Sequence, residues 1–313
     1  MPKSEFELIA ELFAPLAGKG ALGLTDDVAL IAPRAGRELV ATTDAIVAGV
    51  DFFPNEAADV VARRALRVNL SDLAAKGAEP FGYLLTLSLP KPVREGWLRR
   101  FASGLAADQK AFGVSLLGGD MSSTPGPLSV SVTAFGWVPK GRAILRRGAG
   151  PGDLVFVTGT IGDSGAGLRA LKAKKREAAL IARYRVPEPR VALGLRLRGI
   201  ASAALDVSDG LLADLGHIAD VSNVHVAVIA ERVPLSQALR RFDGDVVRAV
   251  TAGDDYEIAF TAPRGKRTQV MAAAKAAGVR VSEIGFVAKG RGVALLGQDG
   301  RVMPVVKKGW EHF

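Results

Sequence analysis

One cluster of turn-forming residues divides this chain of 313 residues into two parts. The segment 147–153 (RGAGPGD) combines three glycines with a proline and precedes a new strand-like run at 154–158. A single hydrophobic core usually stops growing at about 250–300 residues, so a chain of this length is expected to form two domains. The sequence therefore predicts an N-terminal domain at residues 1–147 and a C-terminal domain at residues 148–313.

The first half mixes predicted helices with predicted strands. Ser4 and Glu7 form a capping box ahead of an apolar run, which predicts a helix near the start of the chain. The stretch 57–77 lacks proline, and its Val61 and Val68 lie on one apolar helical face, so it predicts a long helix. A further helix is expected at 93–111. Strands are expected at 28–32, 38–43, 84–89, 114–117 and 128–138.

The second half mixes the same two kinds of element without strict alternation. Because neither half alternates strictly, the pattern favours two α+β domains over one doubly wound parallel sheet. Helices are expected near 163–173, 177–183, 189–199 and 210–221. Strands are expected at 154–158, 203–207, 224–230, 256–261, 281–287 and 292–297.

The composition excludes several classes of protein. Cysteine is absent, which excludes disulfides, thiolate metal ligands and thiol nucleophiles. The start of the chain, MPKSEFE, has no apolar run behind a basic segment, and no stretch is long enough to cross a bilayer. We therefore expect a cytoplasmic protein with no membrane partner.

The net charge of +9 permits nucleic acid or small anionic substrates as partners. The basic residues are dispersed, however, mostly over segments predicted to be helix surfaces. Aromatic residues make up only 6% of the chain, so no base-stacking platform is visible. We expect solvated helix faces and no nucleic-acid partner.

Aspartates recur beside glycine or at the ends of predicted elements. Any one such motif is typical of a turn or a helix cap. Their number and their positions favour a shared chemical role. The motifs are Asp26-Asp27, Thr42-Thr43-Asp44, Ser71-Asp72, Gly118-Gly119-Asp120, Asp206-Val207-Ser208-Asp209-Gly210 and Gly253-Asp254-Asp255.

Two of these motifs lie where a cation is needed. Asp72 continues the helical register of Val61 and Val68, so it is expected to point toward the core, where an ionised carboxylate needs a cation or several donors. Asp206 and Ser208 share one face of a predicted strand directly before a helix, which suits a metal with a phosphate. Almost all candidates are hard oxygen ligands, which indicates Mg²⁺.

Other motifs are expected to be structural. Gly162-Asp163-Ser164-Gly165 resembles a serine-protease nucleophile loop, but that reading needs a histidine before the serine. The three histidines, His217, His225 and His312, all follow it and are expected to be structural. We expect a helix N-terminus at Asp163 or Ser164. The glycine-rich stretch 159–167 is no Walker A loop, because no Gly-Lys-Ser/Thr follows.

Taken in order, the motifs resemble the thiamine-monophosphate kinase family, part of the superfamily of aminoimidazole ribonucleotide synthetase and selenophosphate synthetase. The similarity runs nearly end to end, and so many ordered motifs argue against chance. The matching segments are SEFELI at 4–9, DDVA at 26–29, TTD at 42–44, VAG at 47–49, NLSDLAAKGA at 69–78, LGGD at 117–120, GRA at 141–143, DLVFVTG at 153–159, GDS at 162–164, DVSDG at 206–210, DLGH at 214–217 and GDDYE at 253–257.

The resemblance implies a homodimer of two-domain α+β subunits of the aminoimidazole ribonucleotide synthetase type. The sheet of the N-terminal domain would lie at the dimer interface. ATP and several Mg²⁺ ions would bind between the domains. Domain 1–147 would serve metal binding, ATP binding and dimerisation, and domain 148–313 would complete the ATP and substrate site.

The resemblance also implies roles for residues at matching positions, among which Asp72, Asp120 and Arg146 are expected to be catalytic. Mg²⁺ would be held by Asp27, Thr42, Thr43, Asp44, Asp72, Asp120, Asp206 and Asp209. ATP would be contacted by Gly119, Asp120, Arg146 and Ser208. Thiamine monophosphate would be bound by Asp51, Asp254 and Trp310.

Two positions depart from the family pattern. The family usually has histidine where this chain has Asp51, and often glutamate where it has Asp254. Aspartate at position 51 reverses the expected charge. A carboxylate could still face the cationic thiazolium ring, and Trp310 could stack on that ring through cation–π attraction.

The implied activity is direct transfer of the γ-phosphoryl group of ATP to thiamine monophosphate. A phosphate monoester has a second pKa of about 6, so the acceptor is largely dianionic at neutral pH and no general base is required. Two alternatives stay open. One is another ATP-dependent enzyme of the superfamily with a different acceptor. The other is a basic nucleic-acid-binding protein, which gives no reason for aspartates at six sites.

Overall fold

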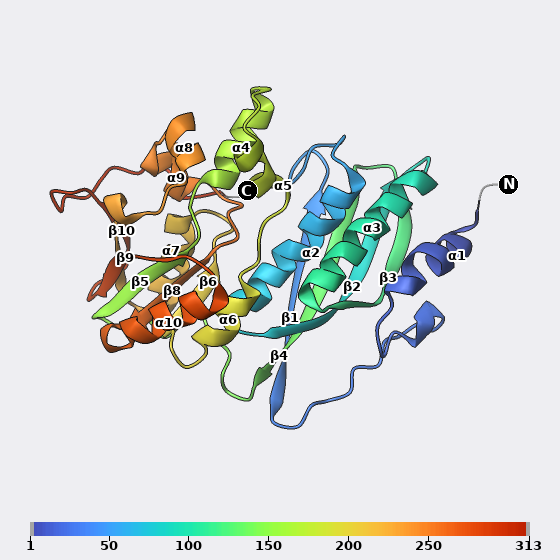
Figure 1. Ribbon diagram of the computed structural model, residues 1–313, viewed down its shortest axis with the longest axis horizontal. Helices are drawn as coiled ribbons and strands as arrows, with labels where there is room; N and C mark the ends of the chain where they lie inside the picture. Colours follow the sequence, from blue (N-terminus) through green and yellow to red (C-terminus); the bar gives the residue numbers. More distant parts are fainter. Residues whose placement is uncertain (1–2, 311–313) are drawn as a thin grey trace. The chain divides into compact units, whose positions relative to one another are not determined.

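The computed structural model describes residues 3–310, which form two compact units. The first unit comprises the chain up to Leu73 together with Glu79–Gly141, and the second comprises Ala74–Ala78 together with the chain from Arg142 onward. Each unit has its own sheet with helices packed on it (Figure 1). The predicted fold class, two α+β domains, is confirmed.

The first unit is built on a four-stranded sheet with the order β1-β4-β2-β3. Its strands are β1 (Arg37–Val47), β2 (Glu79–Pro90), β3 (Ser115–Thr124) and β4 (Ser129–Pro139). The β2/β3 pair is parallel, and the other pairs are antiparallel.

Two long helices cover one face of this sheet, α2 (Ala58–Ala75) and α3 (Glu95–Phe112) (Figure 1). The core between them holds Leu66, Leu87 and Phe101, all buried. Because side chains alternate along a strand, the opposite sheet face carries a different set, including Leu39 and Thr86, which are exposed.

The chain before β1 departs from one expectation. The helix α1 (Glu5–Leu8) begins at the predicted Ser4–Glu7 capping box and continues as π-helical Ile9–Phe13 and 3₁₀-helical Ala14–Leu16; a further 3₁₀ turn spans Leu22–Leu24. The predicted strand at 28–32 is wrong. Val28 and Leu30 are exposed, and the N–H of Leu30 donates to the carbonyl of Gly20 instead of a strand ladder.

The second unit has a six-stranded sheet with the order β10-β7-β9-β5-β8-β6. Only the β10/β7 pair among these six strands is parallel. The strands are β5 (Asp153–Thr158), β6 (Ala203–Asp206), β7 (His225–Ile229), β8 (Ile258–Pro263), β9 (Val281–Ala288) and β10 (Gly292–Leu296).

Helices lie on both faces of the second sheet, as two separate clusters of buried side chains show. One cluster joins Val155 and Leu205 to α4 (Asp163–Lys172), α5 (Ala178–Arg185), α7 (Leu211–Ser222), α8 (Gln237–Phe242) and α9 (Val246–Thr251). The other joins Phe156 and Phe260 to α6 (Val191–Leu197) and α10 (Arg267–Ala277). Short 3₁₀ turns span Ala230–Arg232 and Arg264–Lys266.

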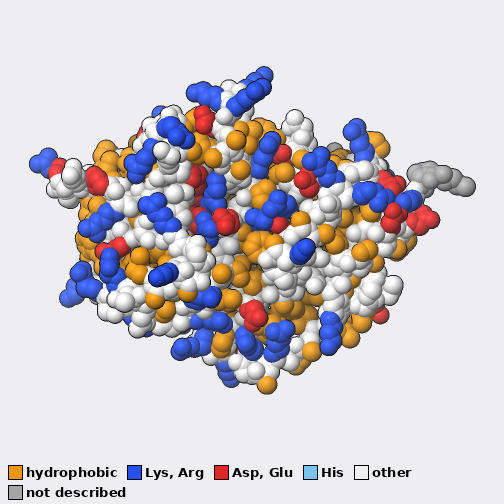
Figure 2. All heavy atoms as spheres, viewed as in Figure 1, with side chains coloured by type: hydrophobic (Ala, Val, Ile, Leu, Met, Phe, Trp, Pro, Cys, Tyr) orange, Lys and Arg blue, Asp and Glu red, His pale blue; other side chains and the backbone are white. Residues whose placement is uncertain are grey.

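The length and polarity of the helices, and the distribution of surface charge, bear on whether a membrane or a nucleic acid could be a partner. Among residues 3–310, every helix is either too short or too polar to cross a membrane. Lys and Arg side chains are spread over the face shown in Figure 2, with apolar and acidic side chains between them.

Candidate active site

Thr42 and Asp72 are joined directly in the first unit. The Oγ1 of Thr42 donates to Oδ2 of Asp72 at 2.6 Å. The N–H of Asp44 donates to Oδ1 of Asn69 at 3.0 Å, so two positions of α2 contact the edge strand β1. Asp72 is half-buried rather than in the core, because it lies near the end of the apolar helix face that Val61 begins. A carboxylate so placed can take a cation without being fully desolvated.

Because side chains alternate along a strand, Thr43 and Asp120 lie on the sheet face that α2 and α3 do not cover. The Oγ1 of Thr43 accepts a hydrogen bond from Oγ1 of Thr133 at 3.1 Å on that face. Asp120 on β3 is paired with the outward-facing Thr86 of β2. β1 and β3 are the two edges of this sheet, about 14 Å apart at the usual strand spacing. Thr42 and Asp72 therefore lie together at one edge of the sheet, whereas Asp120 lies at the other edge and on the other face.

The other first-unit candidates lie in turns and at a close backbone approach. Asp27 is exposed in the irregular segment before β1. The Oδ2 of Asp51 accepts the N–H of Val47 at 2.8 Å and closes the turn after β1. A Cβ atom on Gly119 would lie 1.8 Å from the carbonyl oxygen of Leu85, so only glycine fits directly before Asp120.

In the second unit, the DVSDG motif forms the connection from β6 to α7. Asp206 is buried as the last residue of β6. Ser208 and Asp209 follow, both half-buried, and Gly210, with φ 131°, precedes the first residue of the helix. The predicted strand–turn–helix order is confirmed, with the helix starting at Leu211. The oxygen donors in this turn fit Mg²⁺.

Asp214 lies in the first turn of α7, bonds back to this β6–α7 turn, and is not among the expected site residues. Its Oδ2 accepts the N–H of Asp209 at 3.1 Å and of Gly210 at 3.0 Å, so it caps its own helix. These two donors are therefore occupied rather than offered to a phosphate. Burial, and then the charge of Asp209, raise the pKa of Asp214 to about 7, against the two backbone donors and the charge of Arg146.

Arg146 is exposed in the irregular segment before β5, whereas two other second-unit candidates attach to consecutive carbonyl groups of this turn. The N–H of Asp254 donates to the carbonyl of Ser208 at 2.7 Å, and the N–H of Trp310 donates to the carbonyl of Asp209 at 2.8 Å. Two chain segments far apart in sequence thus bring an acid and an indole to the turn that carries Ser208 and Asp209.

A glycine precedes each of these two residues for the same steric reason. A Cβ atom on Gly253 would lie 2.4 Å from the carbonyl oxygen of Ser208. One on Gly309 would lie 2.7 Å from the carbonyl oxygen of Asp209 and 2.5 Å from Cβ of Ala213. Larger residues would push Asp254 and Trp310 away from the turn.

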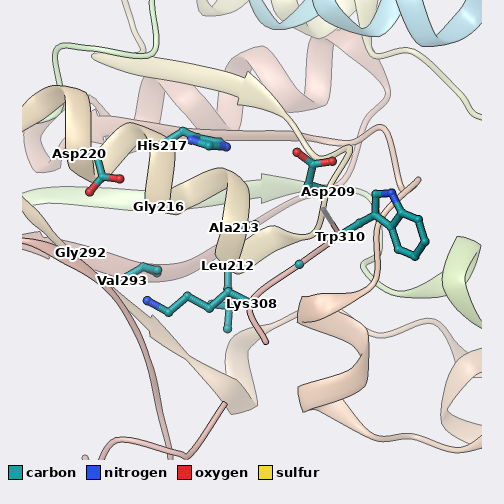
Figure 3. A pocket seen from close by; sticks show the side chains of 11 residues that line it. Asp209, Leu212, Ala213, Gly216, His217, Asp220, Gly292, Val293, Lys308 and Trp310 are labelled. Carbon is teal, nitrogen blue, oxygen red and sulfur yellow. The ribbon is translucent and has the colours of Figure 1, made fainter. Parts of the chain in front are cut away.

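A pocket of about 600 Å³ opens beside this turn, between α7, β10 and the segment 308–310 (Figure 3). Figure 3 shows the indole of Trp310 next to Asp209, with His217 further along α7. One ligand atom each of Asp209, Asp214 and His217 lies within 4.8 Å of the others. The lining residues are Asp209, Leu212, Ala213, Gly216, His217, Asp220, Gly292, Val293, Lys308, Gly309 and Trp310.

The motif Gly162-Asp163-Ser164-Gly165, expected to be structural, lies at the start of a helix. The helix N-terminus expected at Asp163 or Ser164 is confirmed, since α4 begins at Asp163. The Asp163 carboxylate is buried and accepts hydrogen bonds from Thr160 and Ser236, each at 2.6 Å. His217 lies mid-helix as expected but is exposed at the pocket. His312 lies outside the described residues.

The chain matches two family models that together cover most of its length. Residues 25–138 match the AIR synthase related protein N-terminal domain, and residues 150–298 match the corresponding C-terminal domain. The gap between the matches, residues 139–149, contains the start of the turn cluster at 147–153.

Individual relatives and solved structures are similar over nearly the whole chain. The thiamine-monophosphate kinase of Caulobacter vibrioides is 48% identical over 99% of this chain and 91% of its own length. The crystal structure of thiamine-monophosphate kinase from Stenotrophomonas maltophilia K279a has a TM-score of 0.83 and 42% identity, covering 89% of this chain and 90% of that one. The structure of AaThiL complexed with AMPPCP and TMP has a TM-score of 0.81 and 31% identity, covering 99% of this chain and 94% of that one.

Proposed function

Because the chain belongs to the thiamine-monophosphate kinase family of AIR synthase related proteins, we propose that it phosphorylates thiamine monophosphate with ATP to form thiamine diphosphate and ADP. The observation that carries this proposal is the assembly at the β6–α7 turn. There Asp254 and Trp310 are bonded to the carbonyls of Ser208 and Asp209. A carboxylate and an indole suit a cationic ring, and the oxygen ligands of this turn suit a metal ion that binds a phosphate.

The chemistry asks for charge neutralisation and positioning rather than proton removal. A phosphate oxygen of the acceptor attacks the γ-phosphorus, the bond to the β-phosphate oxygen breaks, and ADP leaves. Two unit charges 4 Å apart repel by about 1 kcal/mol in water, and several-fold more in a less polar site. Arg146 is proposed to offset part of this repulsion at the phosphates. In-line alignment supplies much of the remaining rate.

Mg²⁺ is proposed as the resident metal. When bound, it neutralises charge on the transferring phosphoryl group and the phosphate oxygens around it. The proposed ligands are Asp27, Thr42, Thr43, Asp44, Asp72, Asp120, Asp206 and Asp209. Thr43 would act through its backbone carbonyl, because its hydroxyl already bonds Thr133 and the carbonyl of Val132 on the outer sheet face.

The nucleotide and the acceptor are assigned to different residues. Gly119, Asp120, Arg146 and Ser208 are proposed to contact ATP. Asp254 and Trp310 are proposed to face the thiazolium ring, one through its charge and one through stacking. Asp51, whose carboxylate already accepts the N–H of Val47, is proposed as a further acceptor contact.

We propose in addition a cytoplasmic homodimer with a division of labour between residues 1–147 and 148–313. The first part would bind metal and ATP and dimerise, and the second would complete the ATP and acceptor site. The outward face of the β1-β4-β2-β3 sheet supports a dimer contact, because it carries the exposed Leu39 and the half-buried Phe135. Apolar residues exposed on a sheet face are suited to burial against a second copy.

Incubating the purified protein with ATP, Mg²⁺ and thiamine monophosphate is expected to give ADP and thiamine diphosphate in equal amounts. Chelation of the metal with EDTA should stop both products, and excess Mg²⁺ should restore them. Product separation by chromatography measures each species. Formation of ADP only with a different acceptor would favour the alternative of another ATP-dependent enzyme of the superfamily.

Replacing Gly309 by alanine is expected to raise the KM for thiamine monophosphate about ten-fold. The new Cβ would lie 2.5 Å from Cβ of Ala213 and displace Trp310. Overpacking of this kind costs about 1–3 kcal/mol, and 1.4 kcal/mol corresponds to a factor of ten. Gly265→Ala is the matched control, because nothing lies within 4 Å of its added Cβ. Equal KM values for both variants would argue against a role for Trp310.

A further inference from the structure

The loop between α9 and β8 contains two non-glycine residues with left-handed backbone. Asp254 has φ 69° and Tyr256 has φ 50°. Such conformations are uncommon for residues with a side chain, and each costs roughly 1–3 kcal/mol unless the surroundings impose it. Two within three residues indicate a loop whose shape is enforced by its contacts.

Buried carboxylates anchor this loop on the inner side. Asp255 is buried, and its carboxylate accepts the N–H of Gly162 at 2.6 Å and of Ser164 at 3.2 Å. Glu257, also buried, accepts hydrogen bonds from Arg183 at 2.7 Å and from Arg190 at 2.6 Å. The inner pair thus ties the loop to α4, α5 and the start of α6.

The alternate residues of the loop are turned toward the β6–α7 turn. The N–H of Tyr256 donates to the carbonyl of Val207 at 2.8 Å, and that of Asp254 donates to the carbonyl of Ser208 at 2.7 Å. The hydroxyl of Tyr256 donates to Oδ1 of Asp254 at 3.3 Å. Both side chains are half-buried, so the acid is oriented by a neighbour that is itself held by backbone bonds.

We propose that Tyr256 is a positioning residue that orients the Asp254 carboxylate toward the cationic ring of the acceptor. The inference rests on the proposed function and deepens it, because it assigns part of the acceptor specificity to a hydroxyl beside Asp254. The bond from Tyr256 to Oδ1 of Asp254 fixes the orientation of the carboxylate, and with it the direction of Oδ2. The loop anchors keep both residues in their left-handed conformations. Because ATP is assigned to other side chains, we expect its binding not to depend on the hydroxyl of Tyr256.

The test is Tyr256→Phe, which removes the hydroxyl and retains the ring. We expect the KM for thiamine monophosphate to rise about five- to ten-fold, the size of effect that loss of one ordinary hydrogen bond gives, because the contact of 3.3 Å is long. The KM for ATP should stay within two-fold. In an Asp254→Asn background, the same change should add little, because the two residues act through one contact.

Tyr83→Phe is the matched control. The hydroxyl of Tyr83 accepts a hydrogen bond from Gln109 in the core of the first unit, so this variant also loses one hydroxyl contact to a side chain. Its KM for thiamine monophosphate should match the wild type.

The outcomes separate this inference from the proposed function. If the wild type makes no thiamine diphosphate, the proposed function fails. If the wild type is active and Tyr256→Phe leaves the acceptor KM unchanged, only the positioning role fails. Equal rises in the KM for thiamine monophosphate and the KM for ATP would also overturn the positioning role, because they indicate general damage to the site. Full additivity with Asp254→Asn would overturn it as well, because it indicates that the two residues act independently.

Discussion

An Asp72→Asn variant is expected to lose at least about 100- to 1,000-fold in kcat while remaining folded. The substitution removes the negative charge that is proposed to hold Mg²⁺, and loss of one preorganised electrostatic group typically has an effect of this size. The amide oxygen of asparagine can still accept the hydrogen bond from Oγ1 of Thr42, so the contact between β1 and α2 survives. Steady-state kinetics over a range of Mg²⁺ concentrations measure the loss in kcat. Asp120→Asn is expected to show a similar loss in kcat.

The same helix offers a control for this variant. Asp59 lies in the first turn of α2 and pairs with Arg100 at the surface, so Asp59→Asn makes the identical change away from the proposed metal. Its kcat should be that of the wild type. Near-normal turnover in Asp72→Asn would overturn the assignment of Asp72 as a metal ligand. A large loss in Asp59→Asn would show that any charge change on this helix disturbs the enzyme.

Glu257→Gln is expected to lower the free energy of unfolding by about 3–5 kcal/mol, the usual cost of removing one partner from a buried ion pair. Glu257 is fully buried, and Arg183 and Arg190 are only 19% and 13% exposed. Its carboxylate also accepts the hydroxyl of Thr158 at 2.5 Å. The amide would leave the guanidinium groups without their charge partner. Denaturation in urea gives the free energy of unfolding from the transition midpoint and the slope of the transition.

Glu188→Gln is the matched control for this loss of stability. Glu188 pairs with the same two arginines, at 3.0 Å from Arg190 and 3.9 Å from Arg183, but its side chain is 61% exposed. Exposed pairs contribute about 0–1 kcal/mol, so the unfolding midpoint should hardly move. A loss in Glu257→Gln no larger than in Glu188→Gln would show that burial does not strengthen this network.

Elements with a clear hydrophobic period were predictable, and those defined by distant partners were not. The register of Val61 and Val68 predicted α2 because a helix face can be read locally. The apolar run at 28–32 has strand-like composition, yet a strand also needs a neighbour for its ladder, and Leu30 bonds Gly20 instead. The helices α8, α9 and α10 were not predicted.

In the candidate site, too, local geometry was predictable and contacts between distant residues were not. The motif DVSDG predicted its own strand–turn–helix geometry, because that geometry is local. The contact of Thr42 with Asp72, and the two faces of the first-unit sheet, depend on tertiary packing and strand order that one sequence does not reveal. Asp214 had a local signal, an acid in the first turn of a helix, which is typical of a residue that caps backbone donors.

The bond from Trp310 to the carbonyl of Asp209 also determines when this part of the proposed site can form during synthesis of the chain. The two residues are roughly 100 positions apart, and at about 5–20 residues per second the ribosome needs roughly 5–20 s to make that interval. A nascent chain that has already folded β6 and α7 therefore still lacks the indole. The acceptor contact proposed for Trp310 can therefore form only after the segment 308–310 has been synthesised and has docked on the turn.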